Sequence, residues 1–153
     1  MLVIGVTAPI VLATIAVLTF AGLEMAGRTP SALGPPRNIA EAAAMGAASE
    51  VLRLFEAGED PNRVLPVRPE IISSTITRVT GLEAAIWSHH WEMVDMLDRR
   101  GAIRDRATRQ HLLCLTSDLR DSDILNYLSP GRTPDCVQGA ALDRVRARSE
   151  DER

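Results

Sequence analysis

The chain has 153 residues, of which 46% are hydrophobic and 3% aromatic, so its length allows one ordinary domain and little room for a second. Its 17 basic and 20 acidic side chains nearly cancel, which argues against a nucleic-acid binder because such proteins usually carry a basic excess. The two cysteines are too few for a disulfide scaffold or for a cysteine-only zinc site. All the basic residues are arginine, which we interpret as the codon bias of a GC-rich genome, more typical of bacteria.

The first predicted element is a transmembrane helix within residues 1–24. The stretch Leu2–Leu23 carries no charged side chain. As a helix it would rise about 33 Å, at ~1.5 Å per residue, which is enough to cross a hydrocarbon core of ~30 Å. A cleaved signal peptide is disfavoured because no basic residue precedes the run and no clear small-residue cleavage site follows it, and the length of the run disfavours a soluble core helix. We therefore expect a single-pass anchor in a cell (inner) membrane.

The charges beside this stretch bear on which side of the membrane the rest of the chain lies. Arg28 and Arg37 follow the stretch and no basic residue precedes it, so the positive-inside rule favours the cytoplasmic face, with the periplasm left open. Residues 25–37 form the predicted linker. Three prolines and two glycines between Gly27 and Arg37 exclude a regular helix and favour an extended spacer.

The domain after the linker is predicted to consist of repeats. Ala40–Asn62 and Thr80–Ile103 each give a helix of small residues, a short polar turn, a second amphipathic helix, and a glycine followed by a loop. Within these copies, Glu50–Phe55 lines up with Glu92–Leu97 at an offset of 42. A third and weaker copy, Asp123–Leu128, matches the second at an offset of 31.

The second helices of the copies carry a wide apolar face. In the first two copies, apolar residues recur at i, i+1, i+3 and i+4, and a single helix pair cannot bury such a face alone, so neighbouring pairs must stack. Gly58 and Gly101, which follow these helices, are 43 residues apart, so one residue is gained or lost between the copies. The degenerate third copy suits the end of the stack, where one side meets water.

These residues resemble the motifs of the ankyrin repeat family. Thr80–Ala85 corresponds to the Thr-Pro-Leu-His motif that opens the first helix, with glycine in place of proline and glutamate in place of histidine. Gly58–Asn62 matches the closing Gly-Ala-Asp motif with the alanine changed, and Gly101–Ile103 keeps two of its three residues. The resemblance implies an all-α fold of about three ankyrin-like repeats over residues 38–130, and a role in protein–protein interaction.

Residues 131–153 are predicted to form a polar tail. Arg144–Arg153 is almost wholly charged, and we expect it to be solvated or disordered. A short helix opening at Pro134 or Asp135 would place four apolar residues roughly on one face: Val137, Ala140, Ala141 and Val145.

One departure from the family pattern is the insertion Arg63–Val79, where the usual connection is roughly half as long. Its stretch Glu70–Thr80 is rich in β-branched residues and is expected to form an extended, hairpin-like finger. Either this finger contacts a partner, or it folds over the edge of the first repeat and buries its isoleucines there. Both interpretations stay open.

The segment Trp87–Trp91 carries two of the five aromatic residues of the chain and two adjacent histidines. An exposed tryptophan is a common interface anchor and a histidine responds to pH near neutrality, whereas a tryptophan can also fill the seam between two repeats. The candidate partner contacts in the insertion and in this segment are Arg63, Arg68, Arg78, Trp87, His90 and Trp91.

The sequence shows no catalytic or metal-binding pattern. A glycine-rich phosphate loop, a nucleophile elbow and a metalloprotease helix are absent, and His89 and His90 lack further ligands, so we predict no metal and no cofactor. His111 is expected to start a helix of the third repeat. Cys114 lies in an apolar run and is expected to be a small buried hydrophobe, which could pair with Cys136 only in an oxidising compartment.

We therefore expect a membrane-tethered module, not an enzyme, that recruits, scaffolds or regulates a protein partner at the membrane. Two alternatives stay open. One is an inhibitor or immunity-type protein that blocks a single enzyme. The other is an accessory subunit of a larger membrane complex, in which the small residues of Leu2–Leu23 would pack against a neighbouring helix.

Overall fold

The computed structural model describes residues 33–131 and 135–150. The predicted transmembrane stretch Leu2–Leu23 lies outside the described residues. Among the residues that are described, no helix combines the length and the apolar character needed to span a bilayer. The described residues from Pro36 onward form one compact unit.

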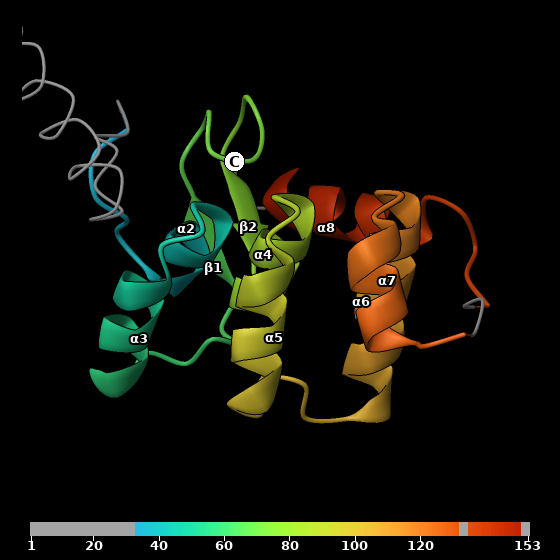
Figure 1. Cartoon of the computed structure of the whole chain (residues 1–153). Helices are drawn as coiled ribbons and strands as arrows, with labels where there is room; N and C mark the ends of the chain where they lie inside the picture. Colours follow the sequence, from blue (N-terminus) through green and yellow to red (C-terminus); the bar gives the residue numbers. More distant parts are fainter. Residues whose placement is uncertain (1–32, 132–134, 151–153) are drawn as a thin grey trace, which may run out of the picture. The chain divides into compact units, whose positions relative to one another are not determined.

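The fold is mostly helical. Of the seven helices in the described part of the chain, six form three consecutive pairs and the last packs against the third pair. The first helices of the pairs contact one another in the order α2, α4, α6, so α4 lies in the middle of the row (Figure 1). The pairs are α2 (Ile39–Ala44) with α3 (Ala48–Glu56), α4 (Gly81–Trp87) with α5 (Trp91–Arg99), and α6 (Arg106–Asp118) with α7 (Ser122–Leu128); α8 is Ala140–Glu150.

The all-α prediction is wrong in one place, because the insertion forms a small antiparallel hairpin of β1 (Leu65–Val67) and β2 (Thr77–Val79). The stretch Glu70–Thr80, expected to form the whole finger, contains only the second strand, β2. The first strand, β1, lies before this stretch. Val67 and Val79 are fully buried, because β1 packs against α2 and β2 packs against α4 and α8. The hairpin is thus part of the core as well as a surface loop.

Both outer edges of the hairpin are occupied by side chains of neighbouring helices. On the β1 side, the amide Nδ2 of Asn38 donates to the carbonyl oxygen of Pro66 at 2.8 Å. On the β2 side, the backbone N–H of Arg78 donates to Oγ of Ser149 at 2.8 Å. Because Asn38 caps α2 and Ser149 belongs to α8, the hairpin is held between these two helices.

The first two pairs begin with the same capping arrangement. The side chain of Asn38 accepts a hydrogen bond from the backbone N–H of Glu41 at 2.9 Å, and that of Thr80 accepts one from Glu83 at 3.2 Å. Glu83 completes a capping box by accepting the N–H of Thr80 at 2.8 Å. Both glutamates are almost fully buried, so the two pairs carry a buried carboxylate at equivalent positions, 42 residues apart.

The turns within the three pairs share one backbone conformation. Each contains one residue in the left-handed region: Gly46 (φ +66°), His89 (φ +59°) and Arg120 (φ +58°). The predicted offset of 42 between the second helices is wrong. Helix α3 begins at Ala48 and α5 at Trp91, so equivalent positions in the two helices are 43 residues apart. The extra residue lies in α4, which has 7 residues against 6 in α2. The offset of 31 between the second and third copies is confirmed, since it relates His89 to Arg120.

Residues 140–150 are not the solvated tail that their charges suggested, because they form helix α8. A helix in this region was the other expectation, but it begins at Ala140 rather than at Pro134 or Asp135. Helix α8 buries Ala141 and Val145 completely against α6 and β2, whereas Val137, which precedes the helix, is 79% exposed. The carboxylate of Asp118, on α6, accepts the N–H groups of Gly139 and of two residues in the first turn of α8, at 2.6 to 3.2 Å. This cap comes from outside the local sequence, so the helix start could not be recognised from neighbouring residues.

Candidate functional site

The three arginines predicted as partner contacts lie in or beside the hairpin. Arg68 follows β1 and forms a bidentate ion pair, with its Nε and Nη2 at 2.9 and 2.8 Å from the carboxylate oxygens of Glu41. Burial of this carboxyl raises its pKa, but the hydrogen bonds from Arg68 and from the backbone N–H groups of Arg37 and Arg68 outweigh burial and hold the pKa of Glu41 below its usual value. The backbone N–H of Arg78 is bound by α8, and Arg63 is exposed in the loop before β1.

The other three predicted contacts surround the turn of the second pair, and this turn contacts its neighbours on both sides. The imidazole of His90 lies over Gly46, since a Cβ placed on Gly46 would be 3.0 Å from Cε1 of that ring. On the other side, Nδ1 of His89 lies 2.7 Å from Oδ2 of Asp121. The three turns therefore form one continuous surface, which we call the turn edge: residues 45–47, 88–90 and 119–121, with Trp87 and Trp91 beside the middle turn.

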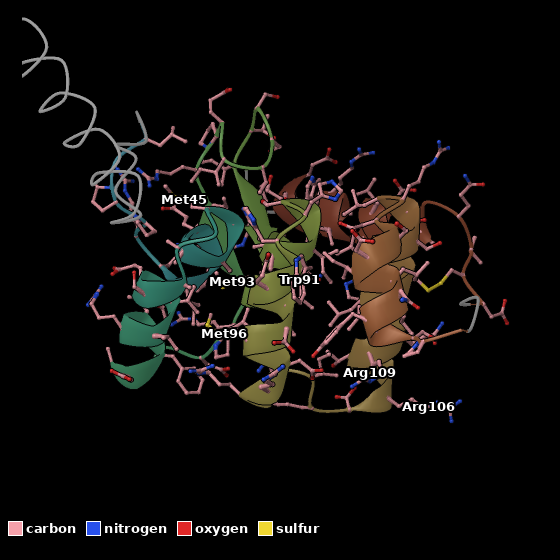
Figure 2. The ribbon with its side chains drawn as sticks, viewed as in Figure 1. Met45, Trp91, Met93, Met96, Arg106 and Arg109 are labelled. Atoms are coloured by element: carbon pink, nitrogen blue, oxygen red, sulfur yellow. A yellow bond between two sulfur atoms is a disulfide. The ribbon has the colours of Figure 1, made fainter. Side chains whose placement is uncertain are left out.

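The two tryptophans beside the turn edge differ in exposure. Trp87 ends α4, is half-buried and packs against the core, as the seam-filling interpretation requires. Trp91 begins α5 and is 49% exposed. Figure 2 shows Trp91 and Met93 at the same end of α5, with Met45 at the end of α2. Among the described residues, the large hydrophobic side chains left exposed are those of Ile76, Trp91 and Val137, so Trp91 is the aromatic one among them.

The contact between the first two turns gives a stability prediction. We expect Gly46→Ala to lower the free energy of unfolding by about 1–2 kcal/mol, because the left-handed backbone disfavours a Cβ and the new methyl group presses on His90. Gly58→Ala is the matched control, since Gly58 also has a positive φ, +91°, but has no atom within 4 Å of its Cβ position. Urea unfolding should show the larger loss for Gly46→Ala; equal losses would mean that the His90 contact does not restrain the turn edge.

A buried charged cluster lies at the start of α4, on the side of the hairpin. Oε1 of Glu83 is 2.7 Å from Nε2 of His111, on α6. Arg148, on α8, donates from Nη1 and Nη2 to the two oxygens of the same carboxylate, both at 3.1 Å. Because a carboxylate only accepts hydrogen bonds, Nε2 of His111 carries the hydrogen. One side chain thus joins α4, α6 and α8.

The environment of Glu83 keeps this carboxyl group ionised. Burial raises its pKa, but hydrogen bonds from His111, Arg148 and the backbone of Thr80 outweigh burial and lower the pKa from the ordinary 4.5 to about 2. The prediction that His111 starts a helix is wrong, because α6 begins at Arg106 and His111 lies within it. The helix begins there because the side chain of Asp105 accepts the backbone N–H of Thr108 and so caps its first turn.

A pocket of about 450 Å³ opens beside this cluster. It lies next to residues 100–105, which connect α5 to α6. This connection is short and forms no hairpin, unlike the connection between α3 and α4. Its lining combines apolar side chains, such as Leu82 and Leu112, with polar ones: Asn62, Thr80, Arg104, Thr108, His111 and Arg148. This pocket could not be recognised in the sequence, because its residues come from four separate stretches of the chain.

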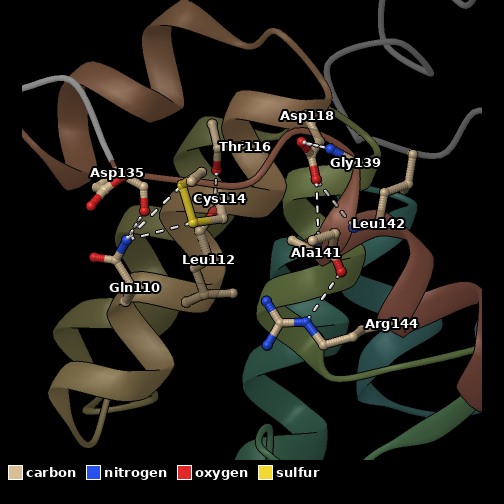
Figure 3. The surroundings of a disulfide bond; sticks show 12 residues. Gln110, Leu112, Cys114, Thr116, Asp118, Asp135, Gly139, Ala141, Leu142 and Arg144 are labelled. Carbon is tan, nitrogen blue, oxygen red and sulfur yellow. Dashed lines mark hydrogen bonds between the residues drawn. A yellow bond between two sulfur atoms is a disulfide. The ribbon is translucent and has the colours of Figure 1, made fainter.

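A disulfide joins Cys114 of α6 to Cys136, in the segment that leads into α8 (Figure 3). Cys114 is buried, as expected, but it is covalently paired rather than an isolated hydrophobe. Nε2 of Gln110 donates to the carbonyl oxygen of Asp135 at 3.2 Å in the same place. Together with the Asp118 cap, these contacts attach the start of α8 to α6.

Among the described residues, no group of three or more histidine, cysteine, aspartate or glutamate side chains is placed to hold a metal ion. Comparison of the chain with protein-family models, with curated proteins and with solved structures gives no match.

Proposed function

We propose that this chain is a non-enzymatic protein-interaction module, built as a short ankyrin-like solenoid and anchored in a membrane by Leu2–Leu23. It binds a protein partner through the turn edge, with Trp91 as the central contact. The shared buried glutamates, the left-handed turn residues and the stacked first helices support the repeat assignment, since they recur in register along the chain.

The observation that carries the proposal is the presentation of Trp91 on a rigid surface. Its indole is 49% exposed, yet the turn that precedes it is fixed on one side by His90 against Gly46 and on the other by His89 against Asp121. A partner therefore gains a large aromatic contact with little loss of conformational entropy. The exposed carboxylate of Glu92, the next residue along α5, favours a partner that brings a basic group beside an apolar one.

The disulfide favours an oxidising compartment for the domain. Structural disulfides persist in the periplasm and outside cells, whereas thiols stay reduced in the cytosol. We therefore propose that the domain lies on the periplasmic side of the membrane, although the arginine count after Leu2–Leu23 favours the opposite side. The covalent bond is the stronger indication, because only two arginines determine that count.

The test is site-specific photo-crosslinking in native membranes. A photo-reactive amino acid at position 91 should give a discrete adduct with one partner, whereas the same group at position 126, an exposed asparagine on α7, should not. Once the partner is identified, Trp91→Ala should weaken its binding at least tenfold and leave the thermal midpoint nearly unchanged. Equal adducts at the two positions, or none at position 91, would contradict the proposal.

A further inference from the structure

The two strands of the hairpin are joined by a loop, residues 68–76, that projects beyond the neighbouring helices (Figure 1). This loop carries three isoleucines. Ile71 and Ile72 are half-buried and pack against the core, as one of the two interpretations of the finger requires. Ile76 is 56% exposed. Packing within the domain therefore accounts for two of the isoleucines and leaves the third in contact with solvent.

The loop is held in shape by its own polar groups. Oγ of Ser73 donates to the carbonyl oxygen of Thr75 at 2.6 Å and lies 2.6 Å from Oγ1 of Thr77, at the start of β2. The backbone N–H of Glu70 donates to the carbonyl oxygen of Ser73 at 2.7 Å. Because these groups have partners inside the loop, moving the loop into a less polar environment costs less than it would for an open loop.

The segment that precedes the domain ends beside the same loop. The carboxylate of Glu41 accepts the backbone N–H of Arg37, the last residue of the predicted linker, at 2.9 Å, and that of Arg68, the first loop residue, at 3.1 Å. Nδ2 of Asn38, the next residue, donates to the carbonyl oxygen of Pro66 in β1. The end of the linker is therefore fixed against the start of the loop.

The apolar stretch Leu2–Leu23 lies only a short way along the chain from this point. Thirteen residues separate Leu23 from Arg37, and a chain of that length spans at most about 50 Å, at ~3.5 Å per residue. With Leu2–Leu23 as the membrane anchor, the start of the loop stays within that distance of the bilayer. Such confinement raises the effective concentration of a second contact, so a contact that is weak alone becomes occupied.

The charges of the loop indicate how it meets a lipid surface. Arg68 and Glu70 are the charged side chains of residues 68–76, and they have opposite signs. Apolar contact rather than net charge therefore drives the association. The exposed carboxylate of Glu70 stays in water or among headgroups, which limits the contact to the outer layer of the bilayer.

From these observations we propose that the loop 68–76 rests on the phospholipid surface, with Ile76 inserted between the lipid headgroups. The domain is then attached to the membrane at two places, and the second attachment determines which face of the domain meets the bilayer. This inference rests on the anchor proposed for Leu2–Leu23 and is independent of the role proposed for Trp91.

The experiment measures the depth of the loop in the full-length chain, reconstituted in vesicles of equal parts phosphatidylcholine and phosphatidylglycerol. A nitrobenzoxadiazole fluorophore is attached to the variant Ser74→Cys, because Ser74 is an exposed loop residue. The native cysteines do not react, since they are joined in a disulfide. The same label on Asn126→Cys, an exposed position of α7, is the control. Phospholipids with a nitroxide beside the headgroup quench a fluorophore at short range.

We expect the nitroxide to quench the label at position 74 at least about threefold more strongly than the label at position 126, because the loop lies at headgroup depth. Concentrated salt should leave this quenching unchanged. Adding Ile76→Asp should reduce the quenching at position 74 to the level at position 126, since a carboxylate resists transfer from water. Val137→Asp is the matched control and should have no effect, because Val137 is 79% exposed but lies outside the loop. Circular dichroism checks that the variants stay folded.

Two outcomes would overturn the loop contact alone: equal quenching at positions 74 and 126, or equal effects of Ile76→Asp and Val137→Asp. Extraction of the vesicles with alkaline carbonate tests the anchor separately. A chain that carbonate extracts has no membrane anchor, and the inference fails together with that proposal. A chain that resists extraction but shows no quenching at position 74 is anchored without the loop contact.

Discussion

The free energy of unfolding is expected to fall by about 3 kcal/mol between pH 5 and pH 2, mainly because of Glu83. The pKa of this carboxyl group is 4.5 ordinarily and about 2 in the folded domain, and each unit of difference corresponds to about 1.4 kcal/mol. Since the folded pKa is the lower one, the stabilisation is fully present above pH 4.5. It is lost as the pH falls toward 2, because the unfolded chain binds the proton first. Urea unfolding followed by circular dichroism at pH 7, 5, 3 and 2 measures the effect.

The variant Glu83→Gln assigns the acid sensitivity to this residue. It should be less stable than the wild type by about 3 kcal/mol at pH 7, because Arg148 loses the charge that compensates its own. Its stability should also change much less between pH 5 and pH 2. Glu50→Gln is the control, since Glu50 pairs with Arg53 on the exposed side of α3, and its pH profile should match that of the wild type. A wild-type acid profile in Glu83→Gln would show that the buried cluster does not set the acid stability.

Loss of the disulfide is expected to have an effect of similar size. The bond closes a loop with a sequence separation of 22, for which the chain-entropy estimate is about 3 kcal/mol. The free energy of unfolding of the double variant Cys114→Ala/Cys136→Ala should therefore be lower than that of the oxidised wild type by about 3 kcal/mol. The variant should accordingly unfold at a lower urea concentration.

Dithiothreitol provides the control for this second prediction. It should move the wild-type unfolding midpoint close to that of the double variant and leave the double variant unchanged. Hydrogen exchange in the reduced wild type should increase first in the amides of α8, because the bond attaches the start of that helix. If exchange increases uniformly through the domain instead, the bond stabilises the fold as a whole rather than the attachment of α8.

The parts of the fold that could be predicted from the sequence depend on neighbouring residues. The helix pairs follow from apolar periodicity, and the cap at Asn38 follows from a polar side chain that stands three residues before the backbone N–H it accepts. The β-branched residues before Thr80 indicated an extended finger, and a strand forms there. The offset of 42 between second helices failed because a sequence alignment cannot show that the extra residue lies inside α4.

The parts that could not be predicted depend on residues far apart in the chain. Glu83 meets His111 across 28 positions and Arg148 across 65, and no periodicity links such partners. The sequence carried one indication: Glu83 stands where the ankyrin motif that this stretch resembles has histidine, and a carboxylate buried in a helix row requires a cation. The charged residues after Arg144 supplied that cation, although their composition alone suggested a solvated tail.

The hydrogen bonds at the two sides of the hairpin affect how copies of the domain meet one another. A two-stranded ribbon normally leaves a row of N–H and C=O groups on each flank, which can template strands from other molecules and begin a fibril. Here Asn38 covers one flank and Ser149 the other. Because Ser149 belongs to α8, this helix also keeps the second flank from pairing with strands of other copies.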